Sequence, residues 1–177
     1  GITALALTNT ELPGHDAGLV RVFQILAGLP GAAALFRWLL RRPAYRRSAF
    51  GFGGAFEDAS RIEGEFTRVT IDPLIGGGIH DAMRSLRRAD LRITQRLDEI
   101  HARIDAPLLC IWGDRDPFFP VAGAQAMVER WPQPARLETI AGNKLLVHEE
   151  SAERVAALMA PFFATHAEGG RDHAISA

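Results

Sequence analysis

The sequence lacks the features that mark several large protein classes. It contains a single cysteine, Cys110, so the chain cannot form an internal disulfide and nothing in it requires an oxidising compartment. Its longest apolar run, residues 25–36, has 12 residues and a Gly-Leu-Pro-Gly break, whereas a membrane-spanning helix needs roughly 20. The first residues carry neither the basic flank nor the cleavage site of a secretory signal. We therefore expect a cytoplasmic protein without a membrane span.

An excess of charge of one sign is also absent. The 20 Lys and Arg residues and the 21 Asp and Glu residues leave a net charge of -1 at pH 7. This balance gives no bulk attraction to nucleic acid or to an anionic membrane, although a single basic face can still occur. The composition, 47% hydrophobic and 23% charged, is that of a globular domain and excludes a disordered or collagen-like chain. We expect neither a nucleic-acid partner nor a membrane partner.

Motifs for common cofactors and metals are missing as well. The glycines at 51–54 and 76–78 do not have the spacing of a dinucleotide-binding loop, and no Walker-type Gly-Lys-Ser/Thr occurs. The six histidines show neither His-x-x-x-His nor His-Glu-x-x-His spacing. The sequence therefore predicts no cofactor and no metal site.

The hydrophobic pattern predicts an α/β fold. Residues 2–8 and 135–140 are short apolar segments bounded by turn-forming residues, and residues 107–112 form an unbroken apolar run typical of a fully buried strand. Apolar residues recur at helical spacing over 121–131 and 155–163. Because strands that alternate with helices pair in parallel, we predict about three parallel strands with flanking helices.

Between the first two strands the chain is mainly helical. Apolar residues fall at helical spacing before and after the break at Pro30-Gly31, and arginines at 84–96 form a basic stripe that is interpreted as a solvated face. Phe50, Phe52 and Phe56 lie in a glycine-rich loop; they either line an apolar pocket or pack in the core, and core packing is the favoured interpretation.

The predicted organisation has four parts. They are a first core strand (1–11), a helical region (12–103), a C-terminal α/β block (104–165) and a flexible tail (166–177). Three strands make a poor sheet, and a parallel sheet needs cover on both faces. We therefore expect the chain, which opens on Gly1 without a Met, to begin within a longer protein. An exposed sheet edge could also pair two copies into a homodimer.

A candidate site follows the buried strand of residues 107–112. The turn reads Trp112-Gly-Asp-Arg-Asp-Pro-Phe-Phe-Pro120, and ligands of open parallel sheets bind at the carboxyl ends of the strands. Asp116, fixed by the proline after it, is suited to hold an imidazole in one tautomer and to stabilise its protonated form. The alternative is an ordinary turn or helix-capping carboxylate.

This turn resembles the acid turn of α/β-hydrolases, in which a strand ends in Gly-x-x-Asp-Pro; Asp116 has the position of the acid. Residues 9–15 resemble the entry to the helical cap in the haloalkane dehalogenase and epoxide hydrolase branch of that superfamily. Residues 140–155 resemble its last strand, histidine loop and final helix. The resemblance covers nearly the whole chain in order and corresponds to the C-terminal half of such an enzyme with its cap region.

The histidine loop departs from the family pattern. The family usually has Gly-x-Gly-His there, and in that register Lys144 and Leu145 occupy the glycine and histidine positions. His148 follows three residues later, before Glu149 and Glu150, whose charges suit the N-terminus of the closing helix. The resemblance therefore leaves two alternatives: a rearranged loop in which His148 is the general base, or a surface His148 beside an inactive site.

No nucleophile is identified in the chain. None of its serines has the flanking glycines of a Gly-x-Ser-x-Gly elbow. Gly14-His-Asp-Ala-Gly18 fits Gly-x-Asp-x-Gly, but residues 9–13 separate it from the strand, so Asp16 is interpreted as part of a cap-entry turn near a helix N-terminus. The nucleophile is expected in an absent N-terminal half.

The resemblance implies a hydrolase that acts on a small apolar substrate, an ester, an epoxide or a halide. A Ser or Asp nucleophile from the absent half would attack, with Asp116 orienting His148 and no cofactor. The sequence identifies neither the substrate nor the residues that bind it. The alternative is a non-catalytic binding or assembly module on the same half-fold, which the absent elbow and Leu145 favour.

Overall fold

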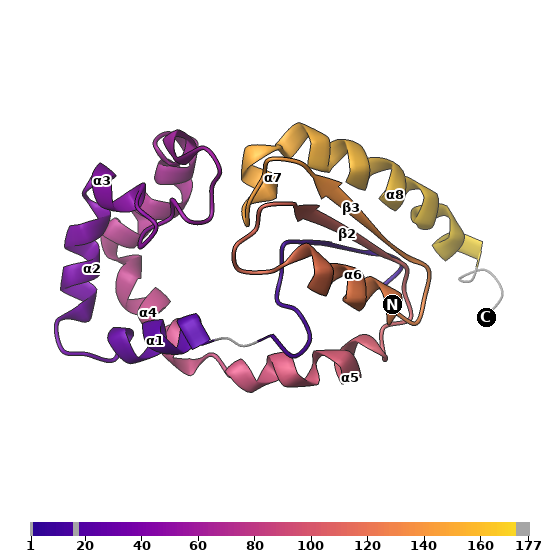
Figure 1. Cartoon of the computed structure of the whole chain (residues 1–177), viewed down its shortest axis with the longest axis horizontal. Helices are drawn as coiled ribbons and strands as arrows, with labels where there is room; N and C mark the ends of the chain where they lie inside the picture. The colour runs from indigo at the N-terminus through magenta and orange to yellow at the C-terminus, as the bar shows by residue number, and fades with distance from the viewer. Residues whose placement is uncertain (1, 16–17, 173–177) are drawn as a thin grey trace. The chain divides into compact units, whose positions relative to one another are not determined.

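The computed structural model describes residues 2–15 and 18–172 (Figure 1). The chain divides into two compact units: residues 1–14 with 95–177, called here the sheet unit, and residues 15–94, called the helical unit. The sheet unit contains β1 (Leu5–Thr8), α5 (Leu97–His101), β2 (Leu108–Gly113), α6 (Val121–Glu129), β3 (Ala135–Ile140), α7 (Val147–Glu150) and α8 (Ala152–Asp172).

The sheet has three parallel strands in the order β1-β2-β3, which confirms the predicted α/β class. In its register, Cys110 of β2 lies between Leu7 of β1 and Leu137 of β3. Every residue of β2 is buried, as expected of an apolar strand with neighbours on both sides and helices on both faces. In the described part of the chain, β1 and β3 are the two edges of the sheet.

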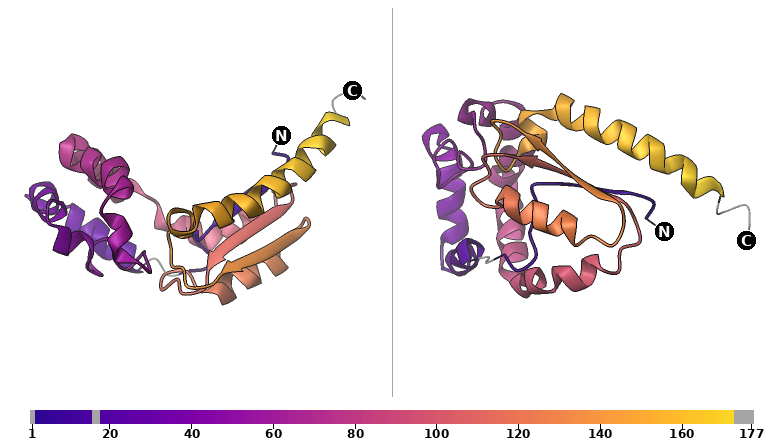
Figure 2. Two further views of the ribbon diagram at one scale, coloured as in Figure 1. Left: turned by 90° about the horizontal axis from the view of Figure 1, so that it is seen from above. Right: turned by 45° about the vertical axis from the view of Figure 1, so that its right-hand side comes forward.

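The side chains of β2 alternate between two separate cores. Leu108, Cys110 and Trp112 pack with Met127 of α6, whereas Leu109 and Ile111 pack on the other face with residues of α7 and α8. Figure 2 shows α6 and α8 on opposite sides of the sheet. The sheet is therefore covered on both faces, and the carboxyl ends of its strands are left for loops.

The polar groups buried in these two cores either form hydrogen bonds or carry no charge. The indole N–H groups of Trp112 and Trp131 donate to the carbonyl oxygens of Phe119 at 2.8 Å and Ala106 at 2.9 Å. Burial raises the pKa of the Cys110 thiol to about 12, so the thiol stays protonated and Cys110 serves as a small core residue.

The helical unit is built around α4. Its elements are α1 (Gly18–Ala27), α2 (Ala32–Leu40), α3 (Pro43–Arg46), the 3-10 turn η1 (Ala59–Ile62), the π-helical turns η2 (Thr67–Ile71) and η3 (Leu74–Gly78), and α4 (Ile79–Arg88). A further 3-10 turn, η4 (Leu91–Arg96), follows. Helices α1 and α2 both contact α4, and Gln24 of α1 donates to the carbonyl oxygens of Leu86 and Ala89, each at 2.9 Å.

The three phenylalanines of the glycine-rich loop have different environments. Phe56 is buried and packs edge-to-face on Phe66, with ring centroids 5.0 Å apart. Phe52 makes a similar contact with Phe66 at 5.2 Å. Phe50 is 82% exposed. Core packing, the favoured interpretation, therefore holds for Phe56 and does not hold for Phe50.

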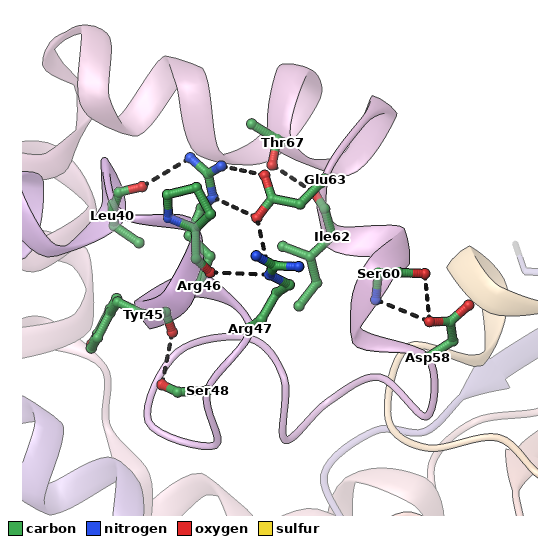
Figure 3. Close-up of polar contacts among 11 residues, drawn as sticks. Leu40, Tyr45, Arg46, Arg47, Ser48, Asp58, Ser60, Ile62, Glu63 and Thr67 are labelled. Carbon is green, nitrogen blue, oxygen red and sulfur yellow. Dashed lines mark hydrogen bonds and ion pairs between the residues drawn. The ribbon is translucent and has the colours of Figure 1, made fainter.

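An ion pair between a buried arginine and a half-buried glutamate connects α3 to the segment that follows it (Figure 3). Arg46 is buried; its Nη1 donates to the carbonyl oxygen of Leu40 at 3.2 Å, and its Nε donates to Glu63 Oε1 at 3.2 Å. Arg46 Nη2 bonds the second oxygen of Glu63, which makes the pair bidentate. The planar guanidinium thus joins the end of α2, α3 and the residue after η1.

The boundaries of the two units differ from the predicted helical region of 12–103. Leu12 packs in the core beside Trp112, and α5 lies with the sheet unit, where Arg130 pairs with Asp98 at 3.1 Å and the ring of His101 contacts that of Trp131. The backbone also stays helical through Asp172, beyond residue 166, where the sequence predicts a tail.

No single helix in the described residues is long and apolar enough to cross a membrane. Helices α1 and α2 reach that length and composition only together, and they are bent by 111° at the break between them.

The Arg46–Glu63 pair yields a stability prediction. Glu63→Gln leaves the buried Arg46 guanidinium without its half-buried counter-charge, so we expect the free energy of unfolding to fall by about 1–2 kcal/mol, measured by urea denaturation. Glu65→Gln is the matched control because Glu65 pairs with Arg68 at 3.2 Å with both side chains exposed; its change should stay within about 0.5 kcal/mol. Equal effects of the two variants would contradict a structural role for the Arg46–Glu63 pair.

Candidate functional site

Two loops meet at the carboxyl ends of β2 and β3. The acid turn, residues 113–120, follows β2, and the loop of residues 141–146 follows β3. The Arg115 amide donates to the carbonyl oxygen of Asn143 at 2.9 Å, and the Gly142 amide donates to Asp114 Oδ1 at 2.7 Å. The two loops therefore hold each other in place, at the edge of the sheet where a ligand site was expected.

Gly113 allows this close approach. A Cβ atom at Gly113 would lie 2.4 Å from the carbonyl oxygen of Lys144 and 2.5 Å from that of Asn143, and both are backbone atoms that cannot turn away. Glycine is thus required by contact with the second loop.

Asp116 is the best-fixed polar group of the acid turn. The residue is 8% exposed, and its Oδ2 accepts a hydrogen bond from Asn9 Nδ2 at 2.6 Å. Its Oδ1 accepts from the backbone amides of Phe118 at 2.8 Å and Phe119 at 3.2 Å. Three donors hold the carboxylate in one orientation, as an orienting acid needs; the two amide bonds also serve a turn-capping carboxylate.

Asn9 is a site residue that the sequence reasoning missed. It directly follows β1, is buried, and adopts a φ of 29°, a conformation that Asn tolerates better than most residues. Its Nδ2 donates to Asp116, and its Oδ1 accepts from the Gly113 amide at 2.9 Å. The available signal was an asparagine at the end of one strand and an aspartate just beyond the end of another, since carboxyl ends of parallel strands converge.

His148 is not joined to Asp116. It lies on α7 with an exposed side chain, and within the described residues no hydrogen bond connects it to Asp116 or to any other group. Leu145, at the register position of the expected histidine, is half-buried. Val147 packs in the core with Ile111, which anchors α7 at this place. The catalytic roles of Asp116 and His148 thus stay predictions.

Asn143 stabilises the loop that carries Leu145. The residue is buried, and its Oδ1 accepts a hydrogen bond from Ser151 Oγ at 2.7 Å, which connects the loop to the start of α8. With its carbonyl oxygen bonded to Arg115, Asn143 links the acid turn to the last helix. The rearrangement that would bring His148 to the site therefore has to preserve or replace these bonds.

Asp16 lies outside the described residues. Among the residues that the structure does describe, no group of three or more His, Cys, Asp or Glu side chains could hold a metal ion.

The helical unit contains an apolar cavity of about 320 Å³. Phe50 and Phe52 line it together with Phe23, Phe36, Tyr45 and Met83, among other residues. The Tyr45 hydroxyl donates to the carbonyl oxygen of Phe50 at 3.1 Å, and burial raises the pKa of Tyr45, which keeps it neutral. The lining suits an uncharged, apolar ligand.

Solved structures with a similar fold are α/β-hydrolases. A putative lipase from Acinetobacter baumannii AYE matches with a TM-score of 0.65 and 14% identity, over 94% of this chain and 54% of that chain. The meta-cleavage product hydrolase from Pseudomonas fluorescens IP01 matches with a TM-score of 0.63 and 16% identity, over 92% and 56%. An α/β-hydrolase fold protein from Burkholderia ambifaria matches with 0.57 and 22%, over 88% and 56%.

These matches show the fold at a coarse level. The chain spans about half the length of the solved structures that it matches and has the architecture of that half of an α/β-hydrolase. Since the matches include meta-cleavage product hydrolases, an esterase and a putative lipase, they do not single out the haloalkane dehalogenase and epoxide hydrolase branch. No family model and no curated protein sequence matches this chain.

The Asn9 contacts predict a large effect of a small substitution. Asn9→Ala leaves a buried carboxylate oxygen and the Gly113 amide without these partners, so the free energy of unfolding should fall by roughly 1–3 kcal/mol in urea denaturation. Asn9→Asp places a second carboxylate against Asp116, so this variant should be least stable near neutral pH and recover as one of the two carboxylates takes up a proton on acidification.

Thr10→Ala is the control, because Thr10 is the next residue and is half-buried. Its effect should be clearly smaller than that of Asn9→Ala. An Asn9→Ala variant as stable as Thr10→Ala would show that the acid turn does not depend on Asn9.

Proposed function

We propose that this chain is part of a hydrolase of the α/β-hydrolase type that acts on a small apolar substrate, an ester, an epoxide or a halide. The observation that carries the proposal is the Asp116 carboxylate. It lies beyond the carboxyl end of the central strand β2, buried and held by Asn9 and two turn amides, in a chain with the architecture of half an α/β-hydrolase.

In the proposed chemistry, Asp116 orients an imidazole and stabilises its protonated form. His148 is the proposed base, which accepts a proton from a serine nucleophile or from the water that hydrolyses an ester formed with an aspartate nucleophile. Because His148 is exposed and not bonded to Asp116 within the described residues, this role requires the loop of residues 141–146 to rearrange.

The nucleophile is proposed to come from outside these 177 residues, since no serine in the sequence has flanking glycines. This proposal is supported by the length of the matched structures, since the chain corresponds to only about half of each. The proposed preference for an apolar substrate is supported by the cavity of about 320 Å³ in the helical unit.

A turnover assay on the longest natural product of the gene tests the proposal. We expect hydrolysis of a small ester, epoxide or haloalkane, and Asp116→Asn and His148→Gln should each lower kcat by roughly 100-fold to 10,000-fold. Thermal unfolding of each variant separates lost catalysis from lost folding. Glu149→Gln, at the exposed neighbour of His148, is the control and should leave kcat unchanged.

The outcomes separate the two roles. Full activity of His148→Gln would exclude His148 as the base, and full activity of Asp116→Asn would exclude the orienting acid. Intact mass and N-terminal sequencing of the same product would show whether a Gly-x-Ser-x-Gly or Gly-x-Asp-x-Gly elbow precedes the chain.

The second candidate is a non-catalytic binding or assembly module. It is favoured by Leu145 at the register position of the family histidine and by the exposed side chain of His148. In that case the natural product would lack a nucleophile elbow and would hydrolyse none of the three substrate classes.

A further inference from the structure

The charges of this protein are distributed unequally between its two units. The helical unit has 12 Arg against 8 Asp and Glu residues, a net charge of +4, although the whole chain is close to neutral. The asymmetry is strongest in residues 17–56, which contain six arginines, no lysine and no acidic residue. The chain as a whole has a net charge of -1, but it contains a basic segment of 40 residues.

The same segment exposes large apolar side chains. On α1, Leu19, Val22 and Leu26 recur at i, i+3 and i+7, and all are exposed; Ile25, on the same side, is 68% exposed. The opposite side of α1 carries Gln24, which bonds to the end of α4. The face of α1 that points away from α4 is thus apolar, the reverse of an ordinary surface helix.

Helix α2 repeats this arrangement. Leu35 and Trp38 are 54% and 50% exposed and lie on one side of the helix. The guanidinium of Arg42, one turn beyond, lies over the Trp38 ring at 3.7 Å from its centroid. Leu29, between the two helices, is also exposed. Figure 1 shows α1 and α2 as consecutive helices beside α4.

Three arginines border these side chains. Arg21 on α1 and Arg41 and Arg42 at the end of α2 are exposed. Within the described residues none of the three forms an ion pair. We call these arginines, with the seven exposed apolar residues, the α1–α2 face; the apolar members are Leu19, Val22, Ile25, Leu26, Leu29, Leu35 and Trp38.

We propose that the α1–α2 face binds an anionic lipid surface. Leucine, isoleucine and valine would enter the boundary between headgroups and acyl chains, Trp38 would lie at the level of the headgroups, and the arginines would pair with lipid phosphates. Charge complementarity selects this partner, because the three arginines of the face are exposed and form no ion pair in the described residues, whereas Arg46 and Arg47 of the same segment pair with Glu63. Neither α1 nor α2 is by itself long and apolar enough to cross a membrane, so the proposal places both helices on its surface.

This inference goes beyond the proposed function and does not depend on it, because its readout is binding and not hydrolysis. It differs from the expectation of no membrane partner, which rested on the charge of the whole chain. Salt screens exposed charges beyond about 10 Å, so a membrane interacts with the charge of the surface next to it and not with the net charge of the whole chain.

Vesicle flotation with the longest natural product of the gene tests the proposal. We expect the chain to float with vesicles of phosphatidylcholine and phosphatidylglycerol, to bind vesicles of phosphatidylcholine alone much more weakly, and to dissociate as salt is added. Trp38 is the reporter, because Trp112 and Trp131 are buried. Its emission should shift to shorter wavelength on binding and be quenched by brominated lipid.

Two pairs of variants separate the charge from the apolar contribution. Arg41→Gln with Arg42→Gln should weaken binding roughly 25-fold, at about fivefold for each arginine. Arg103→Gln with Arg154→Gln is the control, since both residues are exposed in the sheet unit and the net charge changes equally. Ile25→Asn should weaken binding, whereas Ile93→Asn, at a residue that is 51% exposed outside the face, should not.

Several results would overturn the proposal. They are no binding to the anionic vesicles, equal losses in the two double-arginine variants, or a Trp38 already shielded from acrylamide before lipid is added, which would mean that protein covers the face. A dimer in analytical ultracentrifugation that Ile25→Asn dissociates, without vesicle binding, would identify the face as a contact between copies.

Discussion

The candidate site depends on the hydrogen bonds of one buried side chain. Asn9 donates to Asp116 and accepts from the Gly113 amide, and so joins the end of β1 to the end of β2. A buried carboxylate is costly unless it is well paired, and Asn9 with two turn amides provides that pairing. From the acid turn the constraint passes to the loop after β3, through Arg115 and Asn143. The geometry at the carboxyl ends of all three strands thus follows from this contact.

The two units have different physical characters. The sheet unit buries its apolar residues on both faces of β2, and 8 basic against 13 acidic residues give it a net charge of -5. The helical unit is basic, contains a cavity and leaves apolar side chains of α1 and α2 exposed. The two units thus differ in net charge and in how far their apolar side chains are buried.

An α/β-hydrolase architecture does not by itself make this chain an enzyme. The acid turn is well formed, whereas the position where a histidine is expected holds Leu145, and His148 is exposed on α7. The two loops are joined to each other by hydrogen bonds, and α7, which follows the second loop, is anchored by Val147 in the core. The proposed activity therefore needs both a nucleophile from outside these 177 residues and a rearrangement of the segment that carries His148.

The sequence alone determined the three strands, the parallel α/β class and the position of Asp116 after a buried strand, because each follows from patterns of a few neighbouring residues. It could not reveal that Asn9 holds Asp116, since that contact joins residues 107 positions apart. Nor could it separate Phe56 from Phe50, or tell which side of α1 is covered, because apolar residues surround much of that helix. Only tertiary packing decides which of them are buried, because burial depends on the elements that pack against them.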